Sequence, residues 1–262
     1  MSGNLPEDRR RLLYLVARFR GPVELGWYDF TTVFRRSYLG PIWTPIQLAA
    51  WVGTLVLLFS NRLGEGVGEY ALYVGIGMFA WEFLSTAIAA GPAFLTGSAG
   101  VLRNTPIDIS IVTVRRLSMI ASKSVFQLPV PIFLIVIFGG APTWHLFLLA
   151  PVAVIFLLNA YSILTILGVL NAFMRDLEFL TPTVMRFLFF ATPIFWKGDE
   201  GFRKILADYN PFSYFLEIVR ATVNGEIASL QTWVVVGVIT ALCFSLAIWL
   251  QQRFRSAIIY RL

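Results

Sequence analysis

The chain of 262 residues is 57% hydrophobic and only 14% charged, with a formal net charge of +6. Soluble domains usually carry about a quarter charged residues, so this composition excludes an ordinary water-soluble domain and indicates an integral membrane protein. A positive net charge can also indicate nucleic-acid binding. In a membrane protein, however, basic residues on the cytoplasmic side explain it, and no nucleic-acid partner is expected.

Residues 1–42 are predicted to form a cytoplasmic arm at the membrane interface. Two stretches, 9–20 and 24–38, place apolar side chains at helical spacing, and arginines lie opposite those of the first stretch. This pattern is typical of amphipathic helices that lie in the interface, with a short soluble arm as the alternative. The apolar residues are Leu12, Leu15, Val16 and Phe19, followed by Trp27, Phe30, Phe34 and Tyr38.

Six apolar stretches follow the arm. Because a hydrocarbon core of about 30 Å needs roughly 20 helical residues, each stretch is predicted to cross the membrane as a helix. The fold class is therefore an all-α integral membrane protein, with six transmembrane helices at about 43–60, 70–95, 120–138, 144–170, 179–196 and 230–250. Pro129 and Pro131 interrupt the third stretch, so a broken or re-entrant segment is the alternative there. The long external segment 197–229 contains a semi-apolar stretch, 211–223, that is predicted to be helical and partly re-entrant.

The distribution of the 21 Lys and Arg residues predicts that both termini lie in the cytoplasm. In that orientation sixteen of them fall inside, including four that follow the second span, Arg103, Arg115, Arg116 and Lys123. Five fall outside: Arg62, Lys197, Arg203, Lys204 and Arg220. The excess on one side follows the positive-inside rule.

The motifs of several enzyme classes are missing from the sequence. There is no GxxxxGK[ST] loop to cradle the phosphates of ATP, and neither HExxH nor GxSxG occurs. The only histidine, His145, lies at a predicted outer membrane edge, and the only cysteine, Cys243, lies in an apolar run. We therefore expect neither an ATPase nor an intramembrane enzyme, and no cofactor or metal bound by this chain.

Glu82 lies in the middle of the second predicted span. A carboxylate at the bilayer centre costs on the order of 2.5–3.5 kcal/mol, so it should face an aqueous cavity, a partner chain or a cation. Two interpretations stay open, a residue that lines a substrate pathway and one that pairs with Arg186 or another basic group. Phe79, Phe83 and Thr86 fall on or near the same helix face. Aromatic rings beside a hydrogen-bond acceptor suit sugars, although such a stripe more often packs against helices or lipid. The candidate pathway residues are Phe79, Trp81, Glu82, Phe83 and Thr86.

Four segments, in order, resemble the permease subunit of ABC-2 type polysaccharide exporters, which move O-antigen, capsule or teichoic acid chains. They are Asp29-Phe30 with Arg35 to Trp43, Gly77 to Phe83, Arg175-Asp176-Leu177 with Thr192-Pro193-Ile194, and Asn210-Pro211-Phe212 with Glu217 to Arg220. The resemblance extends over about residues 25–262. The sequence departs from the family pattern at Thr192, where the family usually has serine.

The resemblance implies a half-transporter in the bacterial inner membrane, with 43–262 as the ABC-2 type transmembrane domain. Two copies would form the pathway for a lipid-linked polysaccharide among the membrane lipids. Each copy would bind a separate cytoplasmic ATPase subunit, which would hold the ATP and Mg²⁺. The implied ATPase contact is the segment 97–108, with Gly97, Gly100, Arg103 and Asp108. The implied outer gate contains Tyr209, Pro211, Phe212 and Tyr214.

Other functions compete with this interpretation. The closest alternative is an ABC-2 permease for another cargo, such as teichoic acid, capsule, a lipid or a drug. The aromatic content of 15%, the lead from Leu39 to Trp43 and the short outer loop after the first span favour the polysaccharide branch. A membrane-embedded transferase or a structural scaffold is the alternative from a different class. ATPase stimulation by polysaccharide in the presence of a nucleotide-binding partner would discriminate among them.

Overall fold

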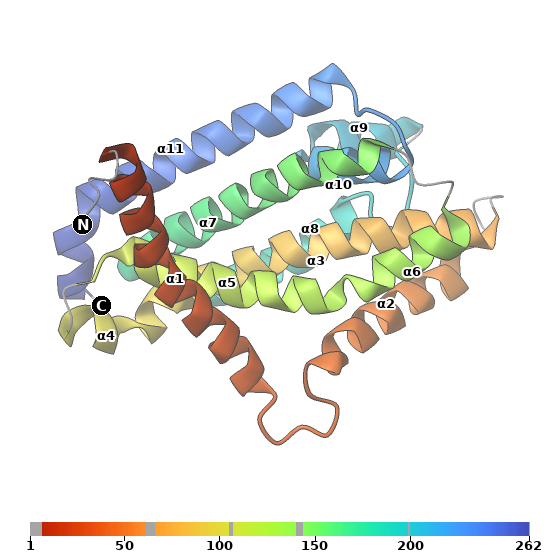
Figure 1. Ribbon diagram of the computed structural model, residues 1–262. Coiled ribbons are helices and arrows are strands. Elements are labelled where there is room, and N and C mark those ends of the chain that lie inside the picture. Colours follow the sequence, from red (N-terminus) through yellow and green to blue (C-terminus); the bar gives the residue numbers. More distant parts are fainter. Residues whose placement is uncertain (1–6, 61–65, 105–106, 140–143, 199, 262) are drawn as a thin grey trace.

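A bundle of long helices makes up the structure (Figure 1). The computed structural model describes residues 7–60, 66–104, 107–139, 144–198 and 200–261, and for 7–19 and 255–261 it describes the backbone alone. Within these ranges no strand is present. The helices are α1 (Glu7–Val33), η1 (Gly40–Ile42), α2 (Trp43–Phe59), α3 (Val67–Gly97), α4 (Ala99–Asn104), α5 (Ile109–Gln127), α6 (Pro129–Phe138), η3 (Trp144–Leu148), α7 (Leu149–Phe173), α8 (Leu177–Ala191), α9 (Gly201–Tyr209), α10 (Pro211–Val223) and α11 (Leu230–Arg261).

The central element of the bundle is α3, against which α2, α5, α6, α7, α8 and α10 all pack. Its side chains are apolar on almost every side, as is typical of a helix that other helices surround. The buried side chains of Tyr70, Leu84 and Leu95 are spread along its length. The side chains on each side of α3 therefore decide the chemistry of the spaces between it and its neighbours.

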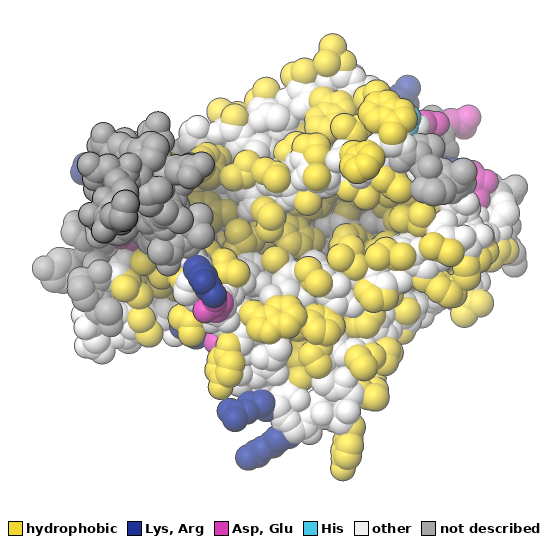
Figure 2. Space-filling model, in the orientation of Figure 1, with side chains coloured by type: hydrophobic (Ala, Val, Ile, Leu, Met, Phe, Trp, Pro, Cys, Tyr) yellow, Lys and Arg dark blue, Asp and Glu magenta, His cyan; other side chains and the backbone are white. Residues whose placement is uncertain are grey.

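Five helical stretches of the described residues are long and apolar enough to cross a membrane: Gly40–Phe59, Val67–Gly97, Ile109–Phe138, Trp144–Phe173 and Leu230–Phe254. Hydrophobic side chains are spread over much of the face that Figure 2 shows in colour, and few charged side chains appear among them. A surface of this kind is stable in lipid and not in water. The prediction of an all-α integral membrane protein is confirmed, and the chain is a multi-pass membrane protein.

The predicted fifth span, 179–196, is wrong in its extent. Its helix, α8, has 15 residues and ends at Ala191, and it is therefore shorter than the roughly 20 residues that cross a bilayer unaided. Pro193 explains the end of the helix, because the residue before a proline is driven out of helical geometry. Thr192 accordingly has a ψ angle of 138°. Residues 192–196, the last part of the predicted span, are non-helical.

The predicted third span begins too late. The helical stretch starts at Ile109, and after α5 it continues as α6. Pro129 takes the first position of α6, where the missing N–H costs nothing. As a consequence Arg115 and Arg116, predicted to precede the span, belong to the same helix as Lys123.

The N-terminal arm contains one described helix where two were predicted. Helix α1 continues through Pro22 and ends at Val33, before the predicted end of the second helix at residue 38. The apolar residues predicted for 9–20 lie outside the described side chains. Helix α1 crosses α5 at the end of the bundle that also carries α4 (Figure 1). We call this end the α4 end and the opposite one, which carries α9, the α9 end.

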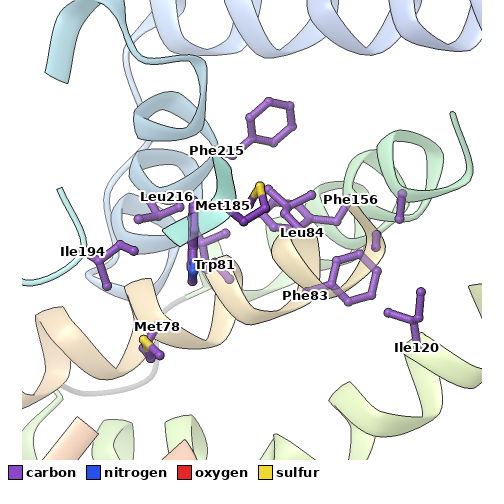
Figure 3. Packing of buried hydrophobic residues seen from close by; sticks show 14 of the residues in the cluster. Met78, Trp81, Phe83, Leu84, Ile120, Phe156, Met185, Ile194, Phe215 and Leu216 are labelled. Carbon is purple, nitrogen blue, oxygen red and sulfur yellow. The ribbon is translucent and has the colours of Figure 1, made fainter. Parts of the chain in front are cut away.

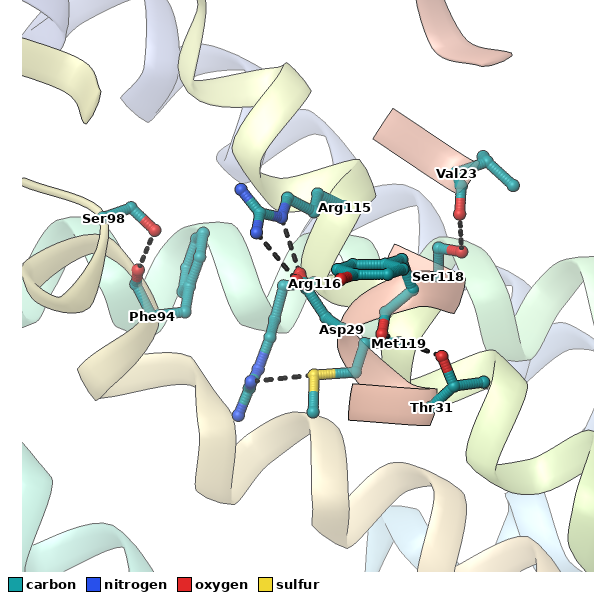
Figure 4. Close-up of polar contacts among 10 residues, drawn as sticks. Val23, Asp29, Thr31, Phe94, Ser98, Arg115, Arg116, Ser118 and Met119 are labelled. Atoms are coloured by element: carbon teal, nitrogen blue, oxygen red, sulfur yellow. Dashed lines mark hydrogen bonds and ion pairs between the residues drawn. The ribbon is translucent and has the colours of Figure 1, made fainter. Parts of the chain in front are cut away.

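A close contact fixes α1 on α5 (Figure 4). At Gly26 the two helices approach so closely that any Cβ would collide with the carbonyl group of Arg115. The guanidinium of Arg115 donates two hydrogen bonds to the carboxylate of Asp29, from Nε at 2.6 Å and from Nη2 at 2.8 Å. The Ser118 hydroxyl donates to the Val23 carbonyl at 2.8 Å. Because two parallel bonds constrain distance and angle together, this pair sets the orientation of α1.

Candidate functional site

The structure does not bring the five candidate pathway residues together. Trp81, Glu82 and Thr86 line a groove between α2, α3 and α8, whereas Phe79 and Phe83 line a cavity between α3, α5, α7 and α10. Figure 3 shows Phe83 near Ile120 and Phe156, with Trp81 on the side of Leu216 and Ile194. The expectation that Phe79 and Phe83 share a surface with Glu82 is wrong, because α3 turns by about 100° per residue and a different set of helices packs on each side.

The groove combines aromatic rings with polar groups. Its volume is about 570 Å³, and its polar side chains are a carboxylate, a guanidinium and two hydroxyls. Rings offer flat surfaces to C–H groups, and the polar groups orient whatever binds between them. The lining consists of Trp51, Met78, Trp81, Glu82, Ser85, Thr86, Ala89, Pro182, Met185, Arg186, Phe189 and Phe190.

The cavity on the other side of α3 is smaller and apolar. Its volume is about 270 Å³, and Ser124 supplies its only polar side chain. The ring of Phe83 lies 6.0 Å from that of Phe156, which in turn lies 5.7 Å from Phe215. Apolar cavities of this kind stay dry and offer a sugar no hydrogen bonds. Phe79 and Phe83 are therefore packing residues in this structure.

Glu82 forms an ion pair with Lys123 of α5. The Nζ atom of Lys123 lies 2.6 Å from Oε1 of Glu82 and 3.4 Å from the Thr86 hydroxyl. Both charged side chains are about a quarter exposed, 26% for Lys123 and 28% for Glu82. Of the two interpretations of Glu82, the structure supports a cation partner, but the partner is Lys123 and not Arg186. The same carboxylate lines the groove, so the pair also fixes one wall of it.

Of the four candidate gate residues, Phe212 is the one whose ring contacts the lining of the groove. Its ring lies 5.4 Å from that of Trp81, edge to face. Pro211 is the exposed first residue of α10, and Tyr209, at the end of α9, is 85% exposed. The Tyr214 hydroxyl donates to a carbonyl in α9, that of Asp208, at 2.9 Å. The predicted helix at 211–223 is confirmed as α10.

Asn210 attaches the start of α10 to the end of α8. Its amide nitrogen donates to the Ala191 carbonyl at 3.1 Å and to the Thr192 hydroxyl at 2.9 Å. Its side-chain oxygen accepts from the backbone N–H of Phe212 at 2.9 Å and so caps α10. One buried amide thus satisfies groups that two helix ends would otherwise leave without partners.

Arg220 holds α10 against α3, a role that sequence reasoning missed. Its guanidinium donates to the carbonyls of Tyr73, Pro193 and Ile194 at 3.2, 2.8 and 3.0 Å. It also lies 3.6 Å above the Tyr73 ring, and a Cβ at Gly77 would collide with it. Burial lowers the pKa of this guanidinium from its usual value, and Tyr73 offsets part of that shift. Pro193 was the available signal, because a proline that ends a helix frees carbonyls that need donors.

The candidate ATPase-contact residues cluster at the α4 end. Gly97 is the last residue of α3, and the exposed Gly100 and Arg103 belong to the short helix α4. Asp108 directly precedes α5, whereas residues 105–106 lie outside the described ranges. Within the segment 97–108, residues Ala99–Asn104 thus form a short helix. Its contact with an ATPase stays a prediction.

Known proteins resemble this chain over most of its length. It matches the ABC-2 type transporter family over residues 23–224. The O-antigen export system permease protein RfbA of Myxococcus xanthus is 24% identical over 206 residues, which cover 77% of this chain and 79% of that protein. Two Klebsiella pneumoniae proteins of the same name are 22% and 23% identical over 192 residues, 71% of this chain and 73% of each relative. The family match includes the whole groove and the whole of α10.

Proposed function

Because this chain belongs to the ABC-2 type transporter family, we propose that it is the membrane subunit of an ATP-driven exporter. Its cargo is a lipid-linked polysaccharide of O-antigen type, moved across the bacterial inner membrane. The names of the similar permeases support this cargo. ATP hydrolysis would take place in a separate cytoplasmic subunit that holds ATP and Mg²⁺.

The observation that carries the proposal is the groove between α2, α3 and α8. Sugars present apolar C–H faces that pack on aromatic rings, and hydroxyls that need hydrogen-bond partners. The rings of Trp51, Trp81 and Phe189 offer the first kind of contact. Ser85 and Thr86 offer the second. The cavity on the other side of α3 has the hydroxyl of Ser124 as its one polar group, so we place the proposed pathway in the groove.

The exposed surface beside the groove supports the proposal of a homodimer. Trp51, Phe187 and Phe190 on α2 and α8 are 57%, 73% and 66% exposed. A second copy related by a twofold axis would bring the same surface from the opposite side. The two grooves would then enclose one pathway, and two ATPase subunits would complete the transporter.

The α4 end is proposed as the place where the ATPase acts, with both termini on the same cytoplasmic side. Asp29 of α1 is bound to Arg115 of α5 (Figure 4), and Lys123 on the same helix is bound to Glu82 in the groove. The part of α5 between Arg115 and Lys123 is a continuous helix, and a helix moves as a stiff element. A displacement of α1 or α4 would therefore reach the wall of the groove through α5.

Reconstitution tests the proposed function. The chain and its ATPase would be co-purified, placed in lipid vesicles and assayed for ATP hydrolysis with and without a lipid-linked polysaccharide. We expect hydrolysis to rise when the polysaccharide is present, and the chain by itself to show none. Specific ATPase activity of the chain alone, or export that continues with an inactive ATPase, contradicts the proposal.

A further inference from the structure

Arg186 is an uncompensated cation in the lining of the groove. Among the described residues, the ion pairs are Arg20 with Glu24, Arg115 with Asp29 and Lys123 with Glu82, and none involves Arg186. The side chain of Arg186 is exposed and has no hydrogen bond to any described residue. Its five N–H donors therefore have no acceptor among the described residues, although Arg186 lines the groove.

The position of Arg186 makes this lack of a partner costly. The same groove is lined by Glu82, the residue at the middle of α3 (Val67–Gly97). An arginine at this depth of a membrane bundle needs water or an anion, and it marks a functional site by default. Pro182, Met185 and Phe189, its neighbours on α8, are apolar.

The nearby carboxylates, those of Glu82 and Glu178, already have other partners. Glu82 is neutralised by Lys123 at 2.6 Å. Glu178, at the start of α8, accepts hydrogen bonds from Asn171 at 3.0 Å and Thr96 at 3.1 Å. The charged side chains that line or brace the groove (Glu82, Lys123 and Arg186) thus leave one net positive charge.

We propose that Arg186 binds an anionic group, a carboxylate or a phosphate, carried by the sugars that pass through the groove. This inference depends on the proposed function and narrows its substrate class to acidic polysaccharides. A guanidinium matches the two oxygens of such a group with two parallel hydrogen bonds. The rings of Trp51 and Phe190 line the same groove and offer surfaces for the sugar rings on either side of the charge.

Two matched oligosaccharides test the proposal: an oligogalacturonate and its fully methyl-esterified, neutral form. Binding of each to the full-length chain would be measured in nanodiscs of zwitterionic lipid, so that anionic headgroups do not compete. For the natural protein we expect about tenfold tighter binding of the acidic oligomer, since one charge-assisted pair distinguishes the two. Inorganic phosphate at equal charge concentration should bind more weakly than either oligomer, because it lacks the sugar rings.

Three variants test whether the preference for the acidic oligomer is due to Arg186. Arg186→Gln should reduce the preference to less than about twofold. Arg186→Lys should keep part of it, because a lysine retains the charge and loses the planar fork. Arg203→Gln, in the exposed part of α9 and outside the groove, should behave like the natural protein.

Each contrary result has a distinct meaning. Equal affinity of the natural protein for both oligomers, or an undiminished preference in Arg186→Gln, overturns the acidic substrate but leaves polysaccharide export standing. No binding of either oligomer contradicts the proposed function as well. A fall in detergent-stable dimer for Arg186→Gln, with the preference unchanged, assigns Arg186 to the contact between subunits and overturns the inference.

Discussion

The groove and the cavity, the two hollows beside α3, share this helix but differ in chemistry. The groove side has an ion pair, two hydroxyls and a free guanidinium around its rings. The cavity side has rings and aliphatic side chains, with the hydroxyl of Ser124 as its one polar group. Aromatic content alone therefore does not identify a sugar pathway. What separates Trp81 from Phe83 is the presence of hydrogen-bonding groups within reach of the ring.

Helix α10 contacts residues of both the groove and the cavity. Phe212 packs on Trp81 beside the groove, and Val219 lines the cavity. Arg220, next to Val219, joins α10 to the carbonyls that follow α8. A change in the position of α10 would consequently alter the groove and the cavity together, so variants must be judged on both stability and export.

The largest expected effect on stability is that of Phe83→Ala on the cavity side. Removing a buried ring from a core costs about 3–5 kcal/mol of unfolding free energy. Phe83 is 8% exposed, so thermal unfolding in detergent should show a loss near 3 kcal/mol. Export per folded dimer should stay normal, and Phe83→Leu should show the same pattern with a smaller loss. Lost export in Phe83→Ala at full stability would assign the cavity, too, to the pathway.

Arg220→Lys should have the next largest effect, about 2 kcal/mol of unfolding free energy. Lysine keeps the charge but cannot donate to three carbonyls with one planar group, and hydrogen bonds from charged donors contribute about 1.5–3 kcal/mol each. Gly77→Ala should reproduce the loss, because its Cβ collides with the guanidinium. Thermal unfolding in detergent measures the loss in both variants. An unchanged melting temperature in Arg220→Lys would mean that the carbonyl contacts do not hold α10.

Breaking the ion pair in the groove wall should cost roughly 1–2 kcal/mol. The value stays below the 3–5 kcal/mol of a fully buried pair because both partners are about a quarter exposed. Glu82→Gln and Lys123→Gln each leave one charge without its partner, whereas the double variant leaves none. Dimer yield and melting temperature should fall in the single variants and recover in the double. Failure of the double variant to recover would show that the charge pair is not the reason for the loss.

Trp51→Ala should change stability least, by less than about 0.5 kcal/mol, because surface substitutions rarely exceed that. Trp51 is 57% exposed and lines the groove. Surface polysaccharide should nevertheless fall about tenfold, since stacking on an aromatic ring contributes on the order of 1 kcal/mol or more. Phe133→Ala, an equally exposed ring on α6 outside both hollows, is the control. Equal export in both variants would mean that the ring of Trp51 does not contact the polysaccharide.

Sequence patterning predicted the membrane class and most helices. The length of an apolar run can be read from neighbouring residues alone, without knowing how the helices pack. The patterning failed at the fifth span, where Pro193 ends α8 and the remaining residues are held by Asn210 and Arg220 from a distant part of the chain. Sequence patterning also counted Lys123 on the cytoplasmic side and did not identify Glu82 as its partner. Charge counting assigns a lysine to a side of the membrane but does not identify the carboxylate that it meets in the folded bundle.

The candidate site was predicted only in part for a related reason. Helical periodicity placed Phe79 and Phe83 near Glu82 on α3, and that spacing is correct along the helix. It does not say which neighbouring helix covers which part of the surface. The packing of α5 and α7 on one side and of α8 on the other assigns these residues to different hollows. The Trp81–Phe212 contact joins residues too far apart in sequence for periodicity to relate them.

Cysteine protection during export tests most directly whether the groove is the pathway. In a Cys243→Ser background, Ser85→Cys would report on the groove and Ala153→Cys on the cavity. Labelling by a small charged thiol reagent would be compared in cells that make the polysaccharide with an inactive ATPase and in cells that make none. If the groove is the pathway, Ser85→Cys labels only without polysaccharide, and the labelling of Ala153→Cys is the same in both kinds of cell. Protection of Ala153→Cys with unchanged labelling of Ser85→Cys would contradict it.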